Sequence, residues 1–184
     1  MFNEERVKIA LKNAEVGLFK YLKIMEMLNK VDVSKDSEFQ RKYNHFYKMR
    51  SRTEEFYSVY YDLLESSKKS GITFDEALKY IHRKLGRVEA SFCSKMVATI
   101  NPEKPIWDKF VLENLNLKVP LPYSKNRIEK VIELYQEIES WYDEFLKTDE
   151  ALKMINLFDH KYESIPITNL KKIDLVLWQM RDAE

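Results

Sequence analysis

The sequence predicts an all-α protein, because it has few helix-breaking residues and its apolar side chains recur at helical spacing. Only three of the 184 residues are glycine and five are proline, and both residue types are considerably commoner in an average protein. Hydrophobic residues make up 45% and charged residues 33% of the chain, a balance typical of a chain that folds. Strand-like alternation occurs only in short runs that conflict with the helical period. We therefore expect about nine helices in a single domain, residues 1–184.

Four helices are expected in the N-terminal half, where each apolar stripe is preceded by a residue that can cap a helix. A Thr followed three residues later by Glu, as at Thr73 and Glu76, is the sequence pattern of a capping box. A glycine after the last apolar residue, as at Gly86, is typical of a helix end. The expected ranges and caps are 4–30 (Asn3), 37–50 (Ser34 or Asp36), 53–69 (Ser51 or Thr53) and 74–85 (Thr73).

Five further helices are expected in the C-terminal half. Asn101-Pro102 should end the first of them, because the residue before a proline is disfavoured in the α conformation. The expected ranges and caps are 88–100, 109–116 (Asp108), 125–147 (Ser124), 149–162 (Thr148) and 169–181 (Thr168). The clearest break is Leu117–Tyr123, which contains Pro120 and Pro122. If the domain has two lobes, their junction is expected near 117–123.

The charge balance gives no global reason to expect nucleic-acid binding, since 31 basic and 30 acidic residues leave a net charge of +1. Any such binding would have to come from a local surface. The best local candidate is Arg41–Arg52, with five Lys or Arg, no acidic residue and three aromatic residues. The alternative is that Tyr43, Phe46 and Tyr47 face the core while the basic side chains are solvated.

Several classes of site and location are disfavoured by the sequence. Cys93 is the only cysteine, so the chain cannot form an internal disulfide or a cysteine-based zinc site, and its apolar surroundings predict a buried side chain. We find no P-loop, GxGxxG, HExxH or GxSxG motif, and we expect neither a metal nor a cofactor. No apolar run is long enough to cross a membrane, and no secretory signal is recognisable. We therefore expect a cytoplasmic protein with no membrane contact.

The stretch Gly86–Leu115 is the one most suggestive of a functional site. A glycine opens it, an apolar helix follows, and a loop bracketed by Pro102 and Pro105 leads to Asp108. An aspartate here is most often a helix cap. The same position suits a catalytic or ligand-orienting carboxylate, because the helix dipole favours the charged form and the loop fixes its place. Both interpretations stay open on spacing alone.

This stretch resembles the helix–hairpin–helix DNA glycosylase superfamily, most closely its 8-oxoguanine glycosylase-like branch. The resemblance implies that the hairpin region, here Lys84, Gly86 and Arg87, contacts a phosphate of double-stranded DNA. It also implies that Asp108, 22 residues after Gly86, stabilises the sugar cation formed as a flipped base leaves, and that Trp107 walls the base pocket. The whole chain also resembles a bacterial protein family that ends in a segment like Lys171–Gln179.

The resemblance predicts a DNA-binding protein, and specifically a repair glycosylase that releases damaged bases. Branches that form a Schiff base carry a lysine just after the hairpin, where this chain has Val88, so lyase activity is not expected. The alternative is a non-catalytic helical interaction module that keeps the fold alone. The absence of further hairpin glycines and the near-zero net charge favour this alternative.

Overall fold

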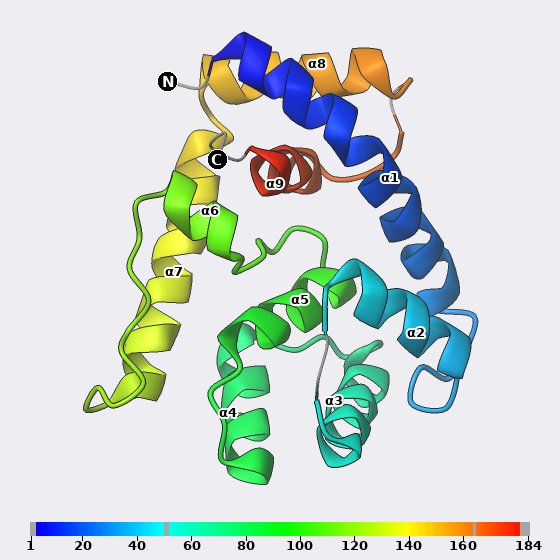
Figure 1. Ribbon diagram of the computed structural model, residues 1–184, viewed down its shortest axis with the longest axis vertical. Coiled ribbons are helices and arrows are strands. Elements are labelled where there is room, and N and C mark those ends of the chain that lie inside the picture. The colour runs from blue at the N-terminus through cyan, green and yellow to red at the C-terminus, as the bar shows by residue number, and fades with distance from the viewer. Residues whose placement is uncertain (1–2, 50–51, 164, 181–184) are drawn as a thin grey trace. The chain divides into compact units, whose positions relative to one another are not determined.

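Nine α-helices and no strand make up the described part of the computed structural model, residues 3–49, 52–163 and 165–180, which confirms the all-α prediction (Figure 1). The helices differ from the expected ranges mainly at their ends. Their bounds are α1 Glu4–Leu28, α2 Ser37–Phe46, α3 Glu54–Ser67, α4 Phe74–Leu85, α5 Ala90–Ile100, α6 Lys109–Asn114, α7 Arg127–Phe145, α8 Asp149–Lys161 and α9 Asn169–Gln179.

The chain divides into two compact units. Unit 1 comprises residues 1–16 and 102–184, and unit 2 comprises residues 17–101. The division therefore falls within α1, at Gly17, and at the Asn101-Pro102 step. Residues 117–123, where the sequence suggests a junction between lobes, lie inside unit 1 and connect α6 to α7.

Local capping explains where most helices begin. At each capped start a side-chain oxygen accepts a hydrogen bond from a backbone N–H of the first turn, which would otherwise lack a partner. Thr73 and Glu76 form the expected reciprocal capping box. Asp36 rather than Ser34 caps α2, and Thr53 caps α3; Ser51, the other candidate for α3, lies outside the described residues. Thr148 and Thr168 cap α8 and α9 as expected.

In unit 1, α8 packs against α9, and the start of α1 lies beside α8 (Figure 1). The Tyr162 hydroxyl, just after α8, donates to the Leu11 carbonyl of α1. Lys172 on α9 contacts Asp159 on α8, with its Nζ 2.9 Å from Oδ2. The first bond joins segments 151 positions apart, and the second joins two consecutive helices.

The core of unit 2 is rich in tyrosine. A chain of buried hydroxyls runs from Tyr47 through Thr99 and Tyr43 to Tyr60, with donor–acceptor distances of 2.9, 3.5 and 2.8 Å. It ends at the Phe92 carbonyl, which accepts from Tyr60 at 2.9 Å. Burial raises the pKa of Tyr60 well above its ordinary value, because the phenolate would lose its hydration in the core.

This core decides between the two interpretations of Arg41–Arg52. Its aromatic residues, Tyr43, Phe46 and Tyr47, are all buried, so they belong to the core and are not available to stack on bases. The Arg52 guanidinium lies 4.9 Å from the centre of the Phe92 ring and pairs with Glu89 at 3.3 Å. Arg50 and Ser51 lie outside the described residues. The segment therefore lacks the aromatic surface expected of a single-strand binding site.

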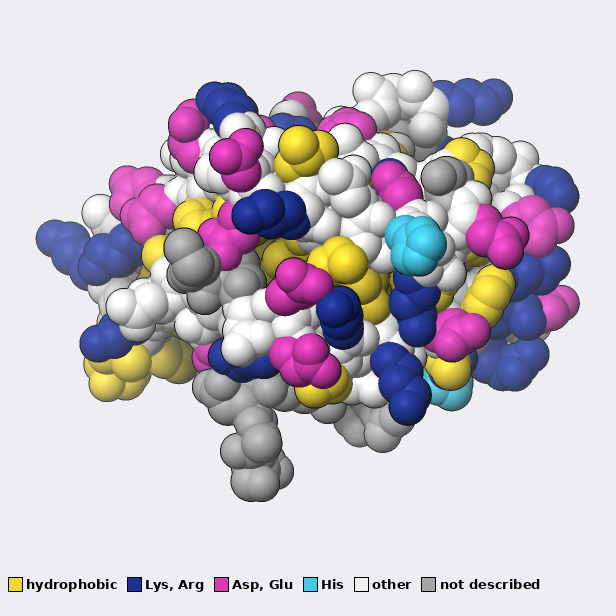
Figure 2. Space-filling view, turned by 90° about the horizontal axis from the view of Figure 1, so that it is seen from above, with side chains coloured by type: hydrophobic (Ala, Val, Ile, Leu, Met, Phe, Trp, Pro, Cys, Tyr) yellow, Lys and Arg dark blue, Asp and Glu magenta, His cyan; other side chains and the backbone are white. Residues whose placement is uncertain are grey.

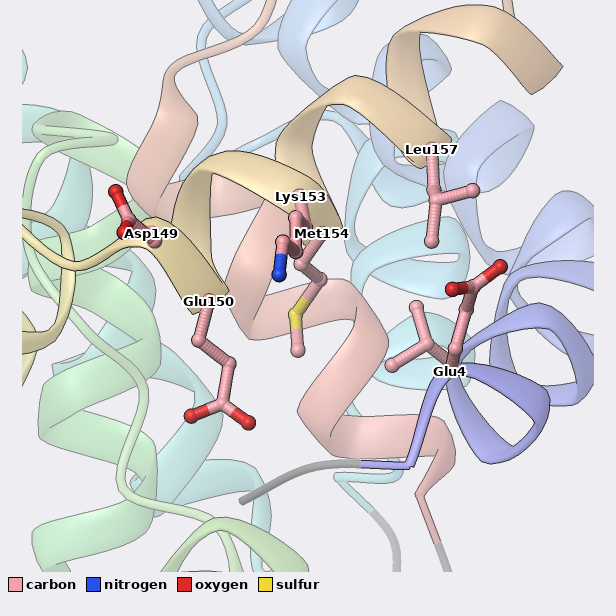
Figure 3. A pocket seen from close by; sticks show the side chains of 7 residues that line it. Glu4, Asp149, Glu150, Lys153, Met154 and Leu157 are labelled. Carbon is pink, nitrogen blue, oxygen red and sulfur yellow. The ribbon is translucent and has the colours of Figure 1, made fainter.

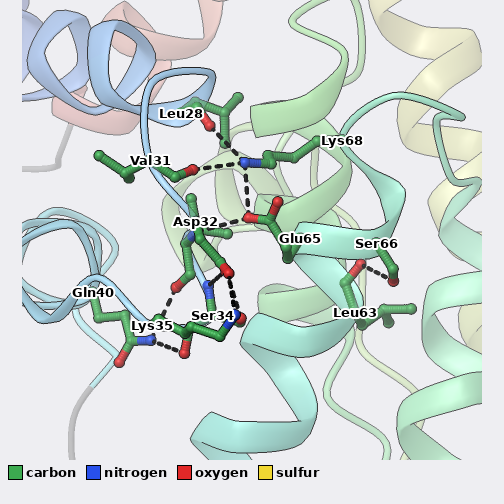
Figure 4. A network of polar contacts seen from close by, with 11 residues as sticks. Leu28, Val31, Asp32, Ser34, Lys35, Gln40, Leu63, Glu65, Ser66 and Lys68 are labelled. Carbon is green, nitrogen blue, oxygen red and sulfur yellow. Dashed lines mark hydrogen bonds and ion pairs between the residues drawn. The ribbon is translucent and has the colours of Figure 1, made fainter.

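A polar network closes the C-terminal end of α1 (Figure 4). The Lys68 ammonium donates to the carbonyls of Leu28 and Val31 at 3.0 and 2.8 Å and pairs with Glu65 at 2.7 Å. Glu65 also accepts from the Val33 amide at 2.7 Å. These bonds supply partners for carbonyls that a helix end leaves unpaired, and they fix the connection to α2.

Cys93 is fully buried in α5, as expected, and desolvation raises the pKa of its thiol. Because the thiolate is the reactive form, we expect negligible labelling of the native protein by a disulfide reagent such as DTNB at pH 8. One equivalent should react once the protein is unfolded in guanidinium chloride. Fast labelling of one equivalent in native buffer would contradict the buried position.

The described helices include none that is long and apolar enough to cross a membrane. On the face shown in Figure 2, basic and acidic side chains are interspersed, in keeping with the near-zero net charge. Any electrostatic attraction of DNA must therefore come from a restricted part of the surface.

Candidate functional site

The loop between α5 and α6, residues 101–108, is anchored at three points within unit 1. The Tyr135 hydroxyl on α7 donates to the Pro105 carbonyl at 2.9 Å. The Thr168 hydroxyl at the start of α9 donates to the Pro102 carbonyl at 2.8 Å. Lys104 pairs with Glu139 on α7 at 2.8 Å. With two prolines restricting its backbone, the loop presents its last residue, Asp108, at a fixed place.

Asp108 is the N-cap of α6, as one of the two interpretations predicts. Its backbone is extended, with φ −126° and ψ 153°, and its Oδ1 accepts from the Phe110 amide at 3.1 Å. The carboxylate is half-buried, whereas the neighbouring Trp107 is buried in the core. Capping occupies a lone pair of one oxygen, so it does not by itself decide whether the carboxylate also performs chemistry.

The short helix that follows Asp108 is fastened to the end of α9. The Asn114 side-chain amide donates to the Phe110 carbonyl at 2.8 Å and lies 3.3 Å from each of the carbonyls of Leu177 and Met180. A six-residue helix is too short to be stable alone. Its position, and with it that of Asp108, therefore depends on these contacts with α9.

A buried ion pair lies in the core of unit 1. The Lys171 ammonium is 2.8 Å from Asp174 Oδ2, and the Tyr142 hydroxyl donates to Oδ1 at 3.2 Å. For a buried acid at Asp174 the sequence suggests a basic neighbour from across the core, but the basic partner in the structure is Lys171, one turn earlier on the same helix. The partner could have been identified from its spacing, because residues three apart share a helix face. The contribution of Tyr142, 32 residues away, has no such local signal.

Burial and the charge of Asp174 both raise the pKa of Tyr142 well above its ordinary value, burial being the larger cause, and the charge of Asp108 adds to the effect. The Asp108 carboxylate is therefore close enough to this polar cluster to interact with it electrostatically. The cluster consists of Tyr142, Lys171 and Asp174.

The predicted phosphate-contacting residues lie at the end of α4 in unit 2. Gly86 adopts the left-handed conformation, with φ 66°, and its amide donates to the His82 carbonyl at 2.8 Å. This backbone N–H therefore closes the helix, which is the role that its position predicts. Lys84 and Arg87 are exposed, the Lys84 ammonium lying 5.9 Å from the centre of the Tyr80 ring and Arg87 4.0 Å from Glu89.

The five predicted site residues are thus divided between the two units. Trp107 and Asp108 belong to unit 1, and Lys84, Gly86 and Arg87 belong to unit 2. Val88, at the position where Schiff-base-forming glycosylases carry a lysine, is half-buried. Lys95 on α5, which lies a turn or two too far along the chain to match that lysine, is buried. Its Nζ is 3.3 Å from the Tyr47 carbonyl and 5.4 Å from the centre of the Phe92 ring.

A separate small cavity of about 290 Å³ lies between the start of α1 and α8, and none of the predicted site residues lines it (Figure 3). Met154 lies at its centre, with Glu4 and Glu150 on opposite sides. Glu4 is paired with Lys8 at 2.8 Å. The described residues contain no group of three or more His, Cys, Asp or Glu side chains placed to hold a metal ion.

Comparison of the chain with protein-family models, with curated proteins and with solved structures found no match.

Proposed function

We propose that this chain is a DNA-binding protein with a glycosylase-like fold that hydrolyses the glycosidic bond of a damaged base. The observation that carries the proposal is the anchored loop that ends in Asp108. Three bonds to α7 and α9 fix the loop, and Asn114 fixes the helix that follows it. A carboxylate held in this way has the preorganisation that electrostatic catalysis needs.

In this proposal Asp108 stabilises the developing sugar cation or activates the attacking water. The reaction is hydrolysis alone, because Val88 offers no amine for a Schiff base where the related branch has a lysine. Trp107 is buried, so its role is to support the loop from the core side rather than to stack on the extruded base.

In this proposal the side chains of Lys84 and Arg87 bind the DNA phosphate. The Gly86 amide already donates within α4, so a phosphate would have to be bound by charged side chains rather than by this backbone N–H. Both side chains are exposed at the same helix end. A contact of this kind contributes affinity that falls with salt and carries no sequence specificity.

The test is a binding titration with two short duplexes, one intact and one carrying a tetrahydrofuran abasic-site analogue, at low and high salt. We expect preference for the analogue, since an extruded nucleotide costs less to accommodate there, together with a marked salt dependence. The double variant Lys84→Gln/Arg87→Gln should lower the salt slope by about two. Lys69→Gln, at the exposed end of α3, is the control. Its salt slope should differ from that of the wild type by less than about one.

The second candidate is a non-catalytic interaction module. It is favoured because two of the predicted site residues serve ordinary helix ends: Gly86 is the C-cap of α4 and Asp108 is the N-cap of α6. Failure of the wild-type protein to bind either duplex, even at low salt, would rule out the DNA-binding function and favour this candidate.

A further inference from the structure

The connection between α6 and α7 exposes three large apolar side chains to solvent. Leu121–Ser124 form a tight turn closed by a bond from the Ser124 amide to the Leu121 carbonyl at 3.0 Å, with Pro122 at its second position. Val119, Leu121 and Tyr123 are 49%, 55% and 83% exposed. Tyr123, at the third position of the turn, has a larger exposed fraction than any other large hydrophobic residue that the structure describes.

The same segment is basic. No Asp or Glu occurs from Asn114 to Ile128, whereas Lys118, Lys125 and Arg127 fall within it. Lys118 and Lys125 are both exposed. Acidic side chains resume on α7, where Glu133 and Glu137 face Lys118 and Lys130 around an open groove of about 500 Å³. The stretch of sequence without acidic residues, residues 117–126, is here called the basic turn. Its Lys118 shares the groove with the two acidic side chains of α7, whereas Lys125 does not line that groove.

The backbone of the basic turn is restrained. Pro120 and Pro122 fix φ at two positions. Asn116 and Asn126, at its two ends, both adopt the left-handed conformation with φ 55°, and the Leu117 amide donates to the Leu112 carbonyl at 2.9 Å. A restrained segment loses little conformational entropy on binding.

We propose that the basic turn is a base-stacking contact to DNA, in which Tyr123 stacks on an unpaired or unstacked base while Lys118 and Lys125 bind the flanking phosphates. The proposal rests on the DNA-binding function proposed above and adds a contact that its predicted site does not include. An exposed aromatic ring between cations is the combination that holds a base and its backbone together. Apolar side chains at such tips can also wedge between base steps and unstack them.

The composition of the basic turn favours nucleic acid over a protein partner. The buried centres of protein–protein interfaces are depleted in lysine, whereas each nucleotide presents a phosphate beside its base. The acidic side chains of α7 oppose DNA lying along that helix, so contact should be limited to the tip. A contact limited to the tip is what the insertion of one side chain, Tyr123, at an unpaired base would require.

The experiment measures affinity and base stacking in the full chain. The probes are a duplex in which 2-aminopurine stands opposite a tetrahydrofuran abasic-site analogue, the matched intact duplex and the 2-aminopurine strand alone. Tyr123→Ala should weaken binding to the abasic duplex about tenfold and abolish the change in 2-aminopurine fluorescence on binding. Tyr123→Phe should retain both, because the ring rather than the hydroxyl stacks. Lys118→Gln/Lys125→Gln should lower the salt slope by about two and preserve the fluorescence change at saturation.

Leu152→Ala is the matched control, since Leu152 on α8 is as exposed as Leu121 but lies outside the basic turn. Its affinity and fluorescence change should equal those of the wild type. Circular dichroism should show that all variants fold, as expected for exposed positions. Comparing the fluorescence change of the abasic duplex with that of the single strand shows whether Tyr123 stacks on a base in a distorted duplex or on a base in a free strand.

Two outcomes would overturn the proposal, and they are distinguishable. If the wild type binds the abasic duplex and Tyr123→Ala binds it equally with the same fluorescence change, the stacking contact is wrong while the proposed DNA-binding function stands. If the wild type binds none of the three probes, both fail, and the basic turn becomes a surface for an acidic protein partner.

Discussion

Replacing Lys171 with methionine is expected to lower the free energy of unfolding by about 3–5 kcal/mol, the usual cost of leaving one charge of a buried pair without its partner. The pair is almost inaccessible, with side-chain exposures of 1% for Lys171 and 5% for Asp174. Removal of the ammonium leaves the Asp174 carboxylate in the core with the Tyr142 hydroxyl as its remaining partner in the cluster. Urea unfolding followed by circular dichroism measures the loss.

The matched control is Lys147→Met. Lys147 also pairs with an acid three residues away, Glu144, at 2.7 Å, but the two side chains are 67% and 76% exposed. Exposed pairs contribute little, so we expect a change below about 1 kcal/mol. The double variant Lys171→Met/Asp174→Leu should recover much of the stability, because replacing both members of a buried pair with apolar residues is often neutral. Equal effects of Lys171→Met and Lys147→Met would contradict the assignment of this cost to burial.

Replacing Asp108 with asparagine is expected to slow base release by about 10²–10⁴-fold, the usual contribution of a positioned acid–base group. Asparagine caps a helix as well as aspartate does, so the bond from the Phe110 amide should survive. The variant therefore removes the negative charge and leaves the local structure in place. Single-turnover assays on duplexes carrying different damaged bases measure the rate, and urea unfolding should give a nearly unchanged stability.

Asp108→Ala separates the two roles of this residue. It loses the cap as well as the charge, so it should cost about 1 kcal/mol of stability in addition to the loss of activity. If the wild-type protein releases no base from any duplex, and Asp108→Ala affects stability alone, Asp108 is a helix cap and the interaction module is the better description of this protein.

Local chemistry made much of the fold predictable. The caps at Thr73, Asp108, Thr148 and Thr168, and the helix end at Gly86, follow from the sequence pattern and are confirmed. Each depends on a hydrogen bond between residues two to four positions apart. Such bonds are determined by residue type and spacing, with no knowledge of the tertiary fold.

Predictions of helix ends were less accurate where no such bond forms. The helix expected from Ser124 begins at Arg127, after Asn126 in the left-handed conformation. The helix expected from residue 88 begins at Ala90, and Glu89 makes no side-chain cap bond. Without a side chain that satisfies the first-turn amides, the start of a helix depends on the path of the preceding chain, which the sequence pattern does not specify.

The sequence by itself determined the helical class, the capped helix starts and the burial of Cys93. Only the tertiary structure decided which residues hold the Asp108 loop. Tyr135, Thr168 and Glu139 are separated from their loop partners by 30, 66 and 35 positions. The exposure of Tyr123 was decided in the same way. The physical reason is that contacts within a helical turn follow from the 3.6-residue period, whereas contacts between distant segments exist only after packing has brought those segments together.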